Sequence, residues 1–200
     1  PLPHEVTDGL ENAPWRVWDV SFKPWPACRH AHPTIDAALA LRARGVRAEE
    51  IEAIRIETYP DAVRFCHRPE PTTEHEAKFS LQHSAATALL DGPPELETFR
   101  GDALPAAAAL RARTQVASAE PFAAAFPQRY GAAVEVRLRS GEVLRETAPD
   151  ALGDPDNPGG HPDLTGTWVL NEKESDTLEP AAGRNRGGGP PPGRGGGGRG

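Results

Sequence analysis

The stretch KPWPACRHAHP, residues 23–33, carries the most information in this chain, because it leads directly into a helix. Pro33 suits the first helical position, where a missing N–H costs nothing. Apolar residues then follow at helical spacing: Ile35, Ala38 and Leu39. We expect the helix to end at about Arg44, where Gly45 provides the stop.

Basic side chains surround this expected helix start. Lys23, Arg29, His30 and His32 all fall within the quoted stretch. A helix start presents unpaired N–H groups and a partial positive charge. Together these groups predict a site for an anion, most naturally a carboxylate or a phosphate. The alternative is an ordinary surface loop whose helix start is satisfied by a cap.

Length and charge limit the classes of function. The 200 residues allow one domain of ordinary size plus a tail. The net charge of -7 argues against nucleic acid as the main partner of the folded part. No apolar run approaches the roughly 20 residues that cross a bilayer, and no signal peptide opens the chain, so we expect no membrane partner. Because the chain contains no methionine, we expect a fragment or a processed product.

The two cysteines, Cys28 and Cys66, permit one disulfide but no disulfide framework and no iron–sulfur ligand set. We interpret them as reduced thiols in a cytoplasmic protein. Cys28 and His32 lie four residues apart, a spacing that suits a metal or a Cys–His pair. Pro33, however, places His32 at the cap, and further ligands at recognisable spacing are missing. We therefore predict no metal site.

Alternating patterns predict strands over residues 15–22, 51–59 and 114–118, and a hairpin of 132–139 with 142–147. In the second of these strands Ile54, Ile56 and Thr58 share one face, and Pro60 ends it. Ser140 and Gly141 form the turn of the hairpin.

Two further helices are expected. Thr73 and Glu76 form a capping box, which predicts a helix from there to about Asp91, with Phe79, Ala86 and Leu90 buried. His75 and His83 would lie two turns apart on it and could face one pocket. A short helix is expected near 103–112. Helices and strands in this order predict an α+β fold, with a mixed or antiparallel sheet packed against helices.

The composition divides the chain into three parts. Residues 1–158 form the α+β domain, and residues 159–182 form a linker with one possible short strand. Apart from Asn185, residues 183–200 are glycine, proline and arginine, which cannot bury a core, so a disordered tail is expected. Such a tail could bind nucleic acid, but it lacks aromatic side chains to stack on bases.

Four motifs occur in order: KPWPACRHAHPTIDAALALR, EIEAIRIETYPDAV, RPEPTTEHEAKFSLQHSAATALLDG and GDPDNP. With them, residues 13–158 resemble the C-terminal half of the MmgE/PrpD family, which includes 2-methylcitrate dehydratase, cis-aconitate decarboxylase and an iminodisuccinate epimerase. The resemblance implies a homodimer in which a large helical domain precedes a smaller α+β domain. This chain resembles only the smaller domain, so we expect it to be incomplete without the helical one.

The resemblance also implies a site between the two domains, where basic residues hold a di- or tricarboxylate. Lys23 matches the lysine of the family motif, and His32 matches the histidine that closes it. Cys28 stands where several members have histidine, and Phe65 falls near a tyrosine of other members. On this basis Lys23, Cys28 and His32 are the expected catalytic residues. Arg29, His30 and Phe65 are the expected substrate-binding residues.

The expected activity is that of a cofactor-free carboxylate lyase or isomerase acting on a substrate such as 2-methylcitrate or cis-aconitate. Lysine and histidine serve as acid and base when their pKa values lie near neutrality. Cationic groups and helix N–H donors stabilise an enediolate. The alternative is a non-catalytic α+β domain that binds a carboxylate ligand or a partner subunit.

Overall fold

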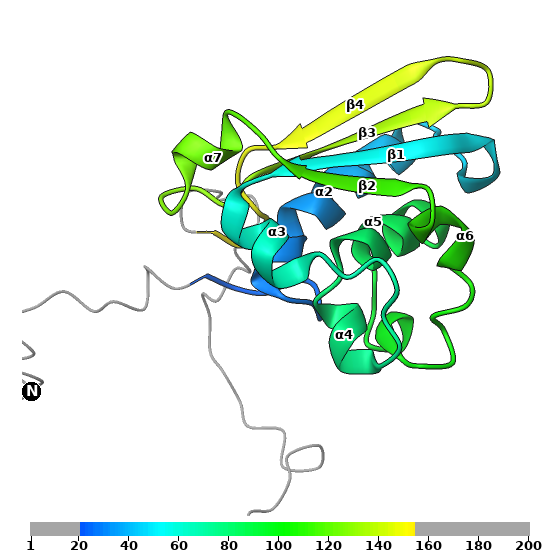
Figure 1. The fold of residues 1–200 in the computed structure, drawn as a ribbon, viewed down its shortest axis with the longest axis horizontal. Coiled ribbons are helices and arrows are strands. Elements are labelled where there is room, and N and C mark those ends of the chain that lie inside the picture. The colour runs from blue at the N-terminus through cyan, green and yellow to red at the C-terminus, as the bar shows by residue number, and fades with distance from the viewer. Residues whose placement is uncertain (1–20, 155–200) are drawn as a thin grey trace, which may run out of the picture. The chain divides into compact units, whose positions relative to one another are not determined.

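The computed structural model describes residues 21–154, which form a four-stranded mixed sheet with helices packed against it (Figure 1). The strands are β1 (Ile51–Thr58), β2 (Thr114–Ser118), β3 (Ala132–Leu138) and β4 (Val143–Ala148). Their order in the sheet is β2-β1-β3-β4. β1 pairs in parallel with β2 and antiparallel with β3, which in turn pairs antiparallel with β4. The expected α+β class is confirmed.

The longest helices cover one face of the sheet (Figure 1). α2 (His32–Ala43) packs on β3, β4 and α5 (Leu81–Leu90). The remaining helices are short: the 3-10 turns η2 (Arg29–Ala31), η3 (Ala48–Glu50) and η4 (Glu97–Phe99), and the α-helices α3 (Pro60–Cys66), α4 (Glu74–Lys78), α6 (Ala108–Arg111) and α7 (Phe122–Ala125).

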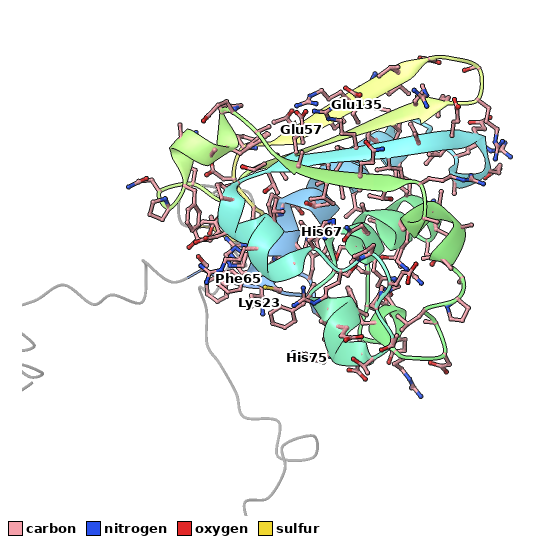
Figure 2. The ribbon with its side chains drawn as sticks, in the orientation of Figure 1. Lys23, Glu57, Phe65, His67, His75 and Glu135 are labelled. Carbon is pink, nitrogen blue, oxygen red and sulfur yellow. The ribbon has the colours of Figure 1, made fainter. Side chains whose placement is uncertain are left out.

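Alternation along β1 separates the two faces of the sheet. Ile54, Ile56 and Thr58 are buried toward the helices, as their spacing predicted. The opposite face carries ion pairs. Glu57 on β1 and Glu135 on β3 lie on this face (Figure 2). Arg145 on β4 has its Nη2 2.6 Å from a carboxylate oxygen of Glu57 and its Nη1 3.7 Å from one of Glu135. Charged pairs thus take the place of an apolar layer on this face.

Several local predictions are confirmed. The predicted helix after Pro33 is α2, and Gly45 follows it with a φ of 95°, which glycine adopts without strain. The hairpin forms β3 and β4. The short helix is confined to α6, because Pro105 and a series of turns occupy the residues before it. None of the helices within residues 21–154 is long and apolar enough to cross a membrane.

The single helix expected from Thr73 to Asp91 is wrong. Thr73 Oγ1 does accept from the Glu76 N–H, at 3.2 Å, but α4 ends after five residues. Ser80 begins α5 as a second cap, since its Oγ accepts from the His83 N–H at 3.0 Å. A serine that bonds the backbone locally competes with a continuous helix. Of the three residues expected to be buried on that helix, Ala86 is buried, whereas Phe79 and Leu90 are partly exposed.

Other predictions lie wholly or partly outside the described residues. They are the strand over 15–22, of which only Ser21 and Phe22 are described, the domain boundaries at 158 and 182, the short strand, and the tail. Ser21 and Phe22 are not part of a strand, and the Phe22 N–H donates to the carbonyl of Gly153 at 2.9 Å. This bond joins the beginning of the described chain to its end.

Two apolar clusters fill the interior. The larger lies between the sheet and helices α2 and α5. The smaller lies where β1 leads into α3, and it combines aromatic side chains with alanines: Tyr59, Ala62, Phe122 and Ala133, with Phe126 and Tyr130 packed against them. The helix start that the sequence singled out lies against this second, aromatic cluster.

Candidate functional site

The candidate site is built on the loop that precedes η2 and α2. Trp25 Nε1 donates to Asp36 Oδ1 at 2.7 Å, and the Leu152 N–H donates to Asp36 Oδ2 at 2.8 Å. The Cys28 N–H donates to the carbonyl of Lys78 at 2.8 Å. The loop is therefore held by α2 and by α4, and the segment at Leu152 is held by the same aspartate of α2. Burial raises the pKa of Asp36 even though these donors lower it.

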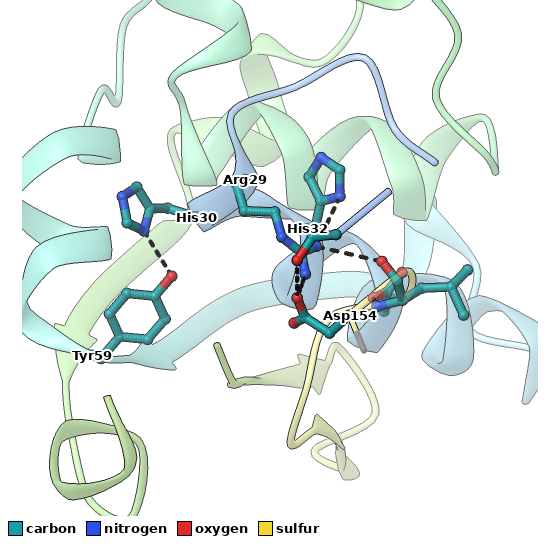
Figure 3. Close-up of polar contacts among 8 residues, drawn as sticks. Arg29, His30, His32, Tyr59 and Asp154 are labelled. Atoms are coloured by element: carbon teal, nitrogen blue, oxygen red, sulfur yellow. Dashed lines mark hydrogen bonds and ion pairs between the residues drawn. The ribbon is translucent and has the colours of Figure 1, made fainter. Parts of the chain in front are cut away.

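Arg29 is directed into the domain rather than toward a ligand. Its guanidinium forms an ion pair with Asp154, and its Nη1 donates to the carbonyl of Leu152 at 3.4 Å (Figure 3). Desolvation by burial lowers the pKa of Arg29. Because Asp154 already compensates the charge, this geometry favours a structural part for Arg29 over the expected contact with substrate.

His32 is also enclosed by the domain. Its side chain is 0% exposed, and its Nε2 lies 3.3 Å from the carbonyl of Ala27. Burial, assisted by the charge of Arg29, lowers the pKa of His32 to about 4, so the ring is neutral. Since the carbonyl can only accept, Nε2 carries the proton and Nδ1 accepts from Arg29 Nη1 at 3.5 Å. Both ring nitrogens are thus occupied inside the protein.

His30 differs from His32 in having one ring nitrogen available. Its Nδ1 lies 2.7 Å from the Tyr59 hydroxyl (Figure 3). Burial raises the pKa of Tyr59 and lowers the pKa of His30, so the phenol keeps its proton and donates it to a neutral ring. Nε2 then carries the imidazole proton. Within residues 21–154 no group forms a hydrogen bond with that nitrogen.

Aromatic rings surround His30. Phe65 stacks on it with ring centroids 5.6 Å apart, and Tyr130 stacks at 6.0 Å. Tyr59 and Phe126 stack on each other at 4.5 Å behind this pair. Phe65 remains 45% exposed, which is unusual for a phenylalanine and places an apolar surface beside the histidine.

Lys23 lies at the same end of the domain as Phe65 (Figure 2). Its side chain is exposed and forms no ion pair with any carboxylate of residues 21–154. Its charge acts on Cys28 and His32, lowering the pKa of both. The described corner therefore combines an exposed ammonium group, a half-buried thiol and a histidine with a free ring nitrogen.

The thiol of Cys28 is the most strongly activated group of this corner. A side-chain hydrogen bond from Cys66, the backbone N–H of His30 and the charge of Lys23 lower the pKa of Cys28 to about 6, against the opposing effect of burial. These groups therefore favour the thiolate form of Cys28. No Cys28–His32 pair forms, because both nitrogens of His32 bond elsewhere.

The other histidines considered from the sequence do not share a pocket. His75 lies exposed on α4, whereas His83 is 0% exposed on α5, and its Nε2 lies 3.0 Å from the carbonyl of Thr98. The break at Ser80 separates them, so that prediction is wrong. No group of three or more potential metal ligands occurs within residues 21–154.

Sequence reasoning missed three contributors to this corner: Tyr59, Tyr130 and Asp154. The strand pattern predicts Tyr59 only as the last residue of a strand, whereas the structure places it at the N-cap of α3, before Pro60. Asp154 lies in the GDPDNP motif, which gave a family signal but no partner. For Tyr130 no sequence signal was available.

The fold and this corner define an α+β domain with a basic, histidine-bearing helix start set against an aromatic cluster. The chain matches the MmgE/PrpD C-terminal domain over residues 25–166 and belongs to the MmgE/PrpD family. This confirms the resemblance carried by the four sequence motifs.

Two relatives bear the same name. The chain is 40% identical to cis-aconitate decarboxylase of Mus musculus over 88 residues, and 35% identical to cis-aconitate decarboxylase of Homo sapiens over 85 residues. Each alignment covers 40% of this chain but only 18% of the relative. The chain thus spans a small part of the relatives that it matches.

Proposed function

We propose that this chain is the substrate-site domain of a carboxylate lyase, either a decarboxylase or a dehydratase, or of a related isomerase. A di- or tricarboxylate such as cis-aconitate or 2-methylcitrate is the proposed substrate, and no cofactor takes part. Family membership and the name of the two relatives support the reaction class. The observation that carries the proposal is that exposed Lys23 lies at the same end of the domain as Phe65, the ring that stacks on His30 (Figure 2).

Lys23 binds a carboxylate of the substrate in this proposal. An ammonium group without a carboxylate partner in the described part of the chain can pair with a ligand without first losing an internal ion pair. The charge would also stabilise an enediolate as it forms next to the carboxylate. Lys78 serves as a contrast, because its Nζ lies 2.6 Å from Glu74 Oε1.

His30 is the proposed catalytic residue, in place of the expected His32. With Tyr59 donating to Nδ1, the neutral ring presents its Nε2 N–H, which can donate a hydrogen bond to a leaving group or to the oxygen of a developing enediolate. Cys28, as a thiolate near neutrality, is the proposed base. His32 and Arg29 act as positioning residues, since they hold the helix start through Ala27 and Asp154.

A helical domain and a second copy of the chain are the proposed partners, as the family resemblance implies. Phe65, which is 45% exposed beside His30, offers an apolar surface that a further domain would cover. Such cover would exclude water and strengthen the interaction of Lys23 with a carboxylate.

The first test is a thermal melt of the chain with citrate, 2-methylcitrate or cis-aconitate. A ligand that binds only the folded state at a hundredfold excess over its Kd adds about 2.7 kcal/mol of stability. We expect one carboxylate to raise the melting temperature of the wild type and of Lys78→Ala, but not of Lys23→Ala. A shift that survives in Lys23→Ala would contradict the assignment of Lys23.

Turnover separates the enzyme from the alternative, a domain that only binds a carboxylate or a partner subunit. The helical domain of a relative is supplied in trans, and consumption of the carboxylate that gave the shift is measured. An enzyme domain regains turnover, and His30→Gln abolishes it while the ligand still shifts the melt. Binding without turnover would favour the non-catalytic alternative.

A further inference from the structure

The two cysteines of the chain meet at the candidate site although they belong to different elements. Cys28 immediately precedes η2, and Cys66 is the last residue of α3, which packs on η2. Both are free thiols, and Cys28 packs against the apolar cluster that contains Cys66. Each cysteine side chain shifts the pKa of the other. The packing of α3 on η2 has therefore brought both cysteines of the sequence to the same corner of the domain.

The two thiols have unequal surroundings. Cys28 is partly exposed, whereas Cys66 is 0% exposed. The groups that act on Cys28, namely Lys23, the N–H of His30 and the thiol of Cys66, favour its thiolate form. The neighbouring Cys28 and burial raise the pKa of Cys66, which stays a thiol. An accessible thiolate with a protonated thiol beside it is the arrangement found in redox-responsive cysteine pairs.

We propose that Cys28 and Cys66 form a reversible disulfide within one chain when a hydroperoxide oxidises Cys28. The Cys28 sulfur attacks one peroxide oxygen, so that an S–O bond forms and the O–O bond breaks. With hydrogen peroxide, the leaving hydroxide takes up a proton and becomes water. Cys28 is then a sulfenic acid.

Cys66 completes the reaction. Its thiol loses a proton and its sulfur attacks the sulfur of Cys28, so that the S–S bond forms, the S–O bond breaks and a second water leaves. The two thiols supply two electrons, and these reduce one hydrogen peroxide to two waters. A dithiol reductant reverses the change by thiol–disulfide exchange. The disulfide joins the residue that precedes η2 to α3, the helix that carries Phe65.

The test counts thiols in the full chain. The reduced protein is treated with hydrogen peroxide, unfolded, alkylated with N-ethylmaleimide and weighed by mass spectrometry. Since the sequence has two cysteines, the untreated chain takes two adducts. We expect the oxidised chain to take none, to have lost two hydrogen atoms and to migrate as a monomer without reductant. Dithiothreitol should restore both adducts.

Two variants assign the roles of the cysteines. In Cys66→Ser the sulfenic acid of Cys28 should persist and be trapped by dimedone, because no second thiol can displace the oxygen. In Cys28→Ser the buried Cys66 should resist both peroxide and alkylation of the folded protein. Circular dichroism establishes whether each variant is folded. If a variant does not fold, the thiol count of the wild-type chain still tests the proposal.

Several results would overturn the proposal. One is a wild-type chain that keeps both adducts after peroxide treatment. Another is a Cys28 sulfinic acid with Cys66 still reactive, and a third is a disulfide between two chains. None of these readouts depends on a carboxylate or on turnover, so the proposal and the proposed function fail or succeed separately.

Discussion

Two regions of the domain contain an arginine in contact with a buried histidine. At the candidate site Arg29 Nη1 lies 3.5 Å from His32 Nδ1, and between α6 and α5 Arg111 Nη1 lies 3.2 Å from His83 Nδ1. In both, the Nε2 of the histidine donates to a backbone carbonyl. An arginine–histidine contact therefore stabilises the fold both at the candidate site and far from it.

The two regions differ in how the arginine charge is compensated. Asp154 forms an ion pair with Arg29, whereas no carboxylate of residues 21–154 forms one with Arg111, which instead donates to the carbonyl of Leu104 at 2.5 Å. Occupied ring nitrogens mark both histidines as structural. His30 is the exception, because its Nε2 has no hydrogen-bond partner among residues 21–154, whereas both ring nitrogens of His32 are occupied.

Removing the carboxylate of Asp154 should destabilise the region around Arg29. Asp154→Ala leaves the charge of Arg29 in a mostly buried position without its counterion, and we expect a loss of about 3 kcal/mol in the free energy of unfolding. Urea denaturation measures it. As a control, Asp102→Ala removes a carboxylate that is 79% exposed and 3.7 Å from Arg100, and should cost less than about 1 kcal/mol. Equal losses would contradict the difference drawn between the two ion pairs.

Acid should weaken both regions. His32 has its pKa lowered to about 4 by burial, and burial also lowers the pKa of His83. The unfolded chain binds these protons near pH 6.5, before the folded chain does, so stability falls as the pH drops below that value. For His32 alone the loss between pH 7 and 5 is about 2 kcal/mol.

The pH dependence of melting can be assigned to individual residues. His32→Asn and His83→Asn should each reduce the loss of stability between pH 7 and pH 5, as measured by melting at both pH values. For His32→Asn the reduction should be about 2 kcal/mol. An unchanged slope in His32→Asn would show that its ring is already charged in the folded protein.

Replacing each arginine should destabilise the two regions to different extents. The loss in the free energy of unfolding should be smaller for Arg111 than for Arg29. Arg111→Met leaves His83 Nδ1 and the Leu104 carbonyl without this donor, at a cost of about 1–2 kcal/mol. Arg29→Met also takes the counterion from buried Asp154, so its cost should approach that of Asp154→Ala. Denaturation of both variants under one condition checks the order. A costlier Arg111→Met would reverse our interpretation.

The smallest loss of stability is expected when Tyr59, the hydrogen-bond partner of His30, is replaced. Tyr59→Phe keeps the ring stacked on Phe126 but removes the hydroxyl 2.7 Å from His30, a loss of about 1 kcal/mol. The NMR signal of the His30 ring in a pH titration should move in this variant, while that of His32 should not. A change confined to His32 would contradict the pairing of His30 with Tyr59.

Local signals predicted most of the regular elements. α2, β1 and the β3–β4 hairpin follow from periodicity, a proline near a helix start and glycines at turns, all of which act within a few residues. The helix expected from Thr73 failed because Ser80 fits either a helix interior or a cap. Its Oγ donates to the carbonyl of Arg68 at 2.5 Å, a long-range contact that favours the cap.

The sequence predicted which stretch carries the candidate site, but not how its side chains contact one another. The basic stretch and the family motifs located Lys23, Cys28 and the histidines, because chemistry and motif order are properties of the sequence. Which histidine keeps a free nitrogen depends on Tyr59, which lies 29 residues from His30. The placement of Cys28 and Cys66 at one corner likewise depends on α3 packing against η2.

Composition, periodicity and motif order thus determined the α+β class, the family and the stretch that carries the site, since these depend on neighbours along the chain. Tertiary structure decided which groups are occupied internally. Asp154 neutralises Arg29, and the Ala27 carbonyl and Arg29 enclose His32, whereas Tyr59 leaves His30 Nε2 available. The physical reason is that burial and hydrogen-bond partners, which set charge and proton position, come from segments distant in sequence.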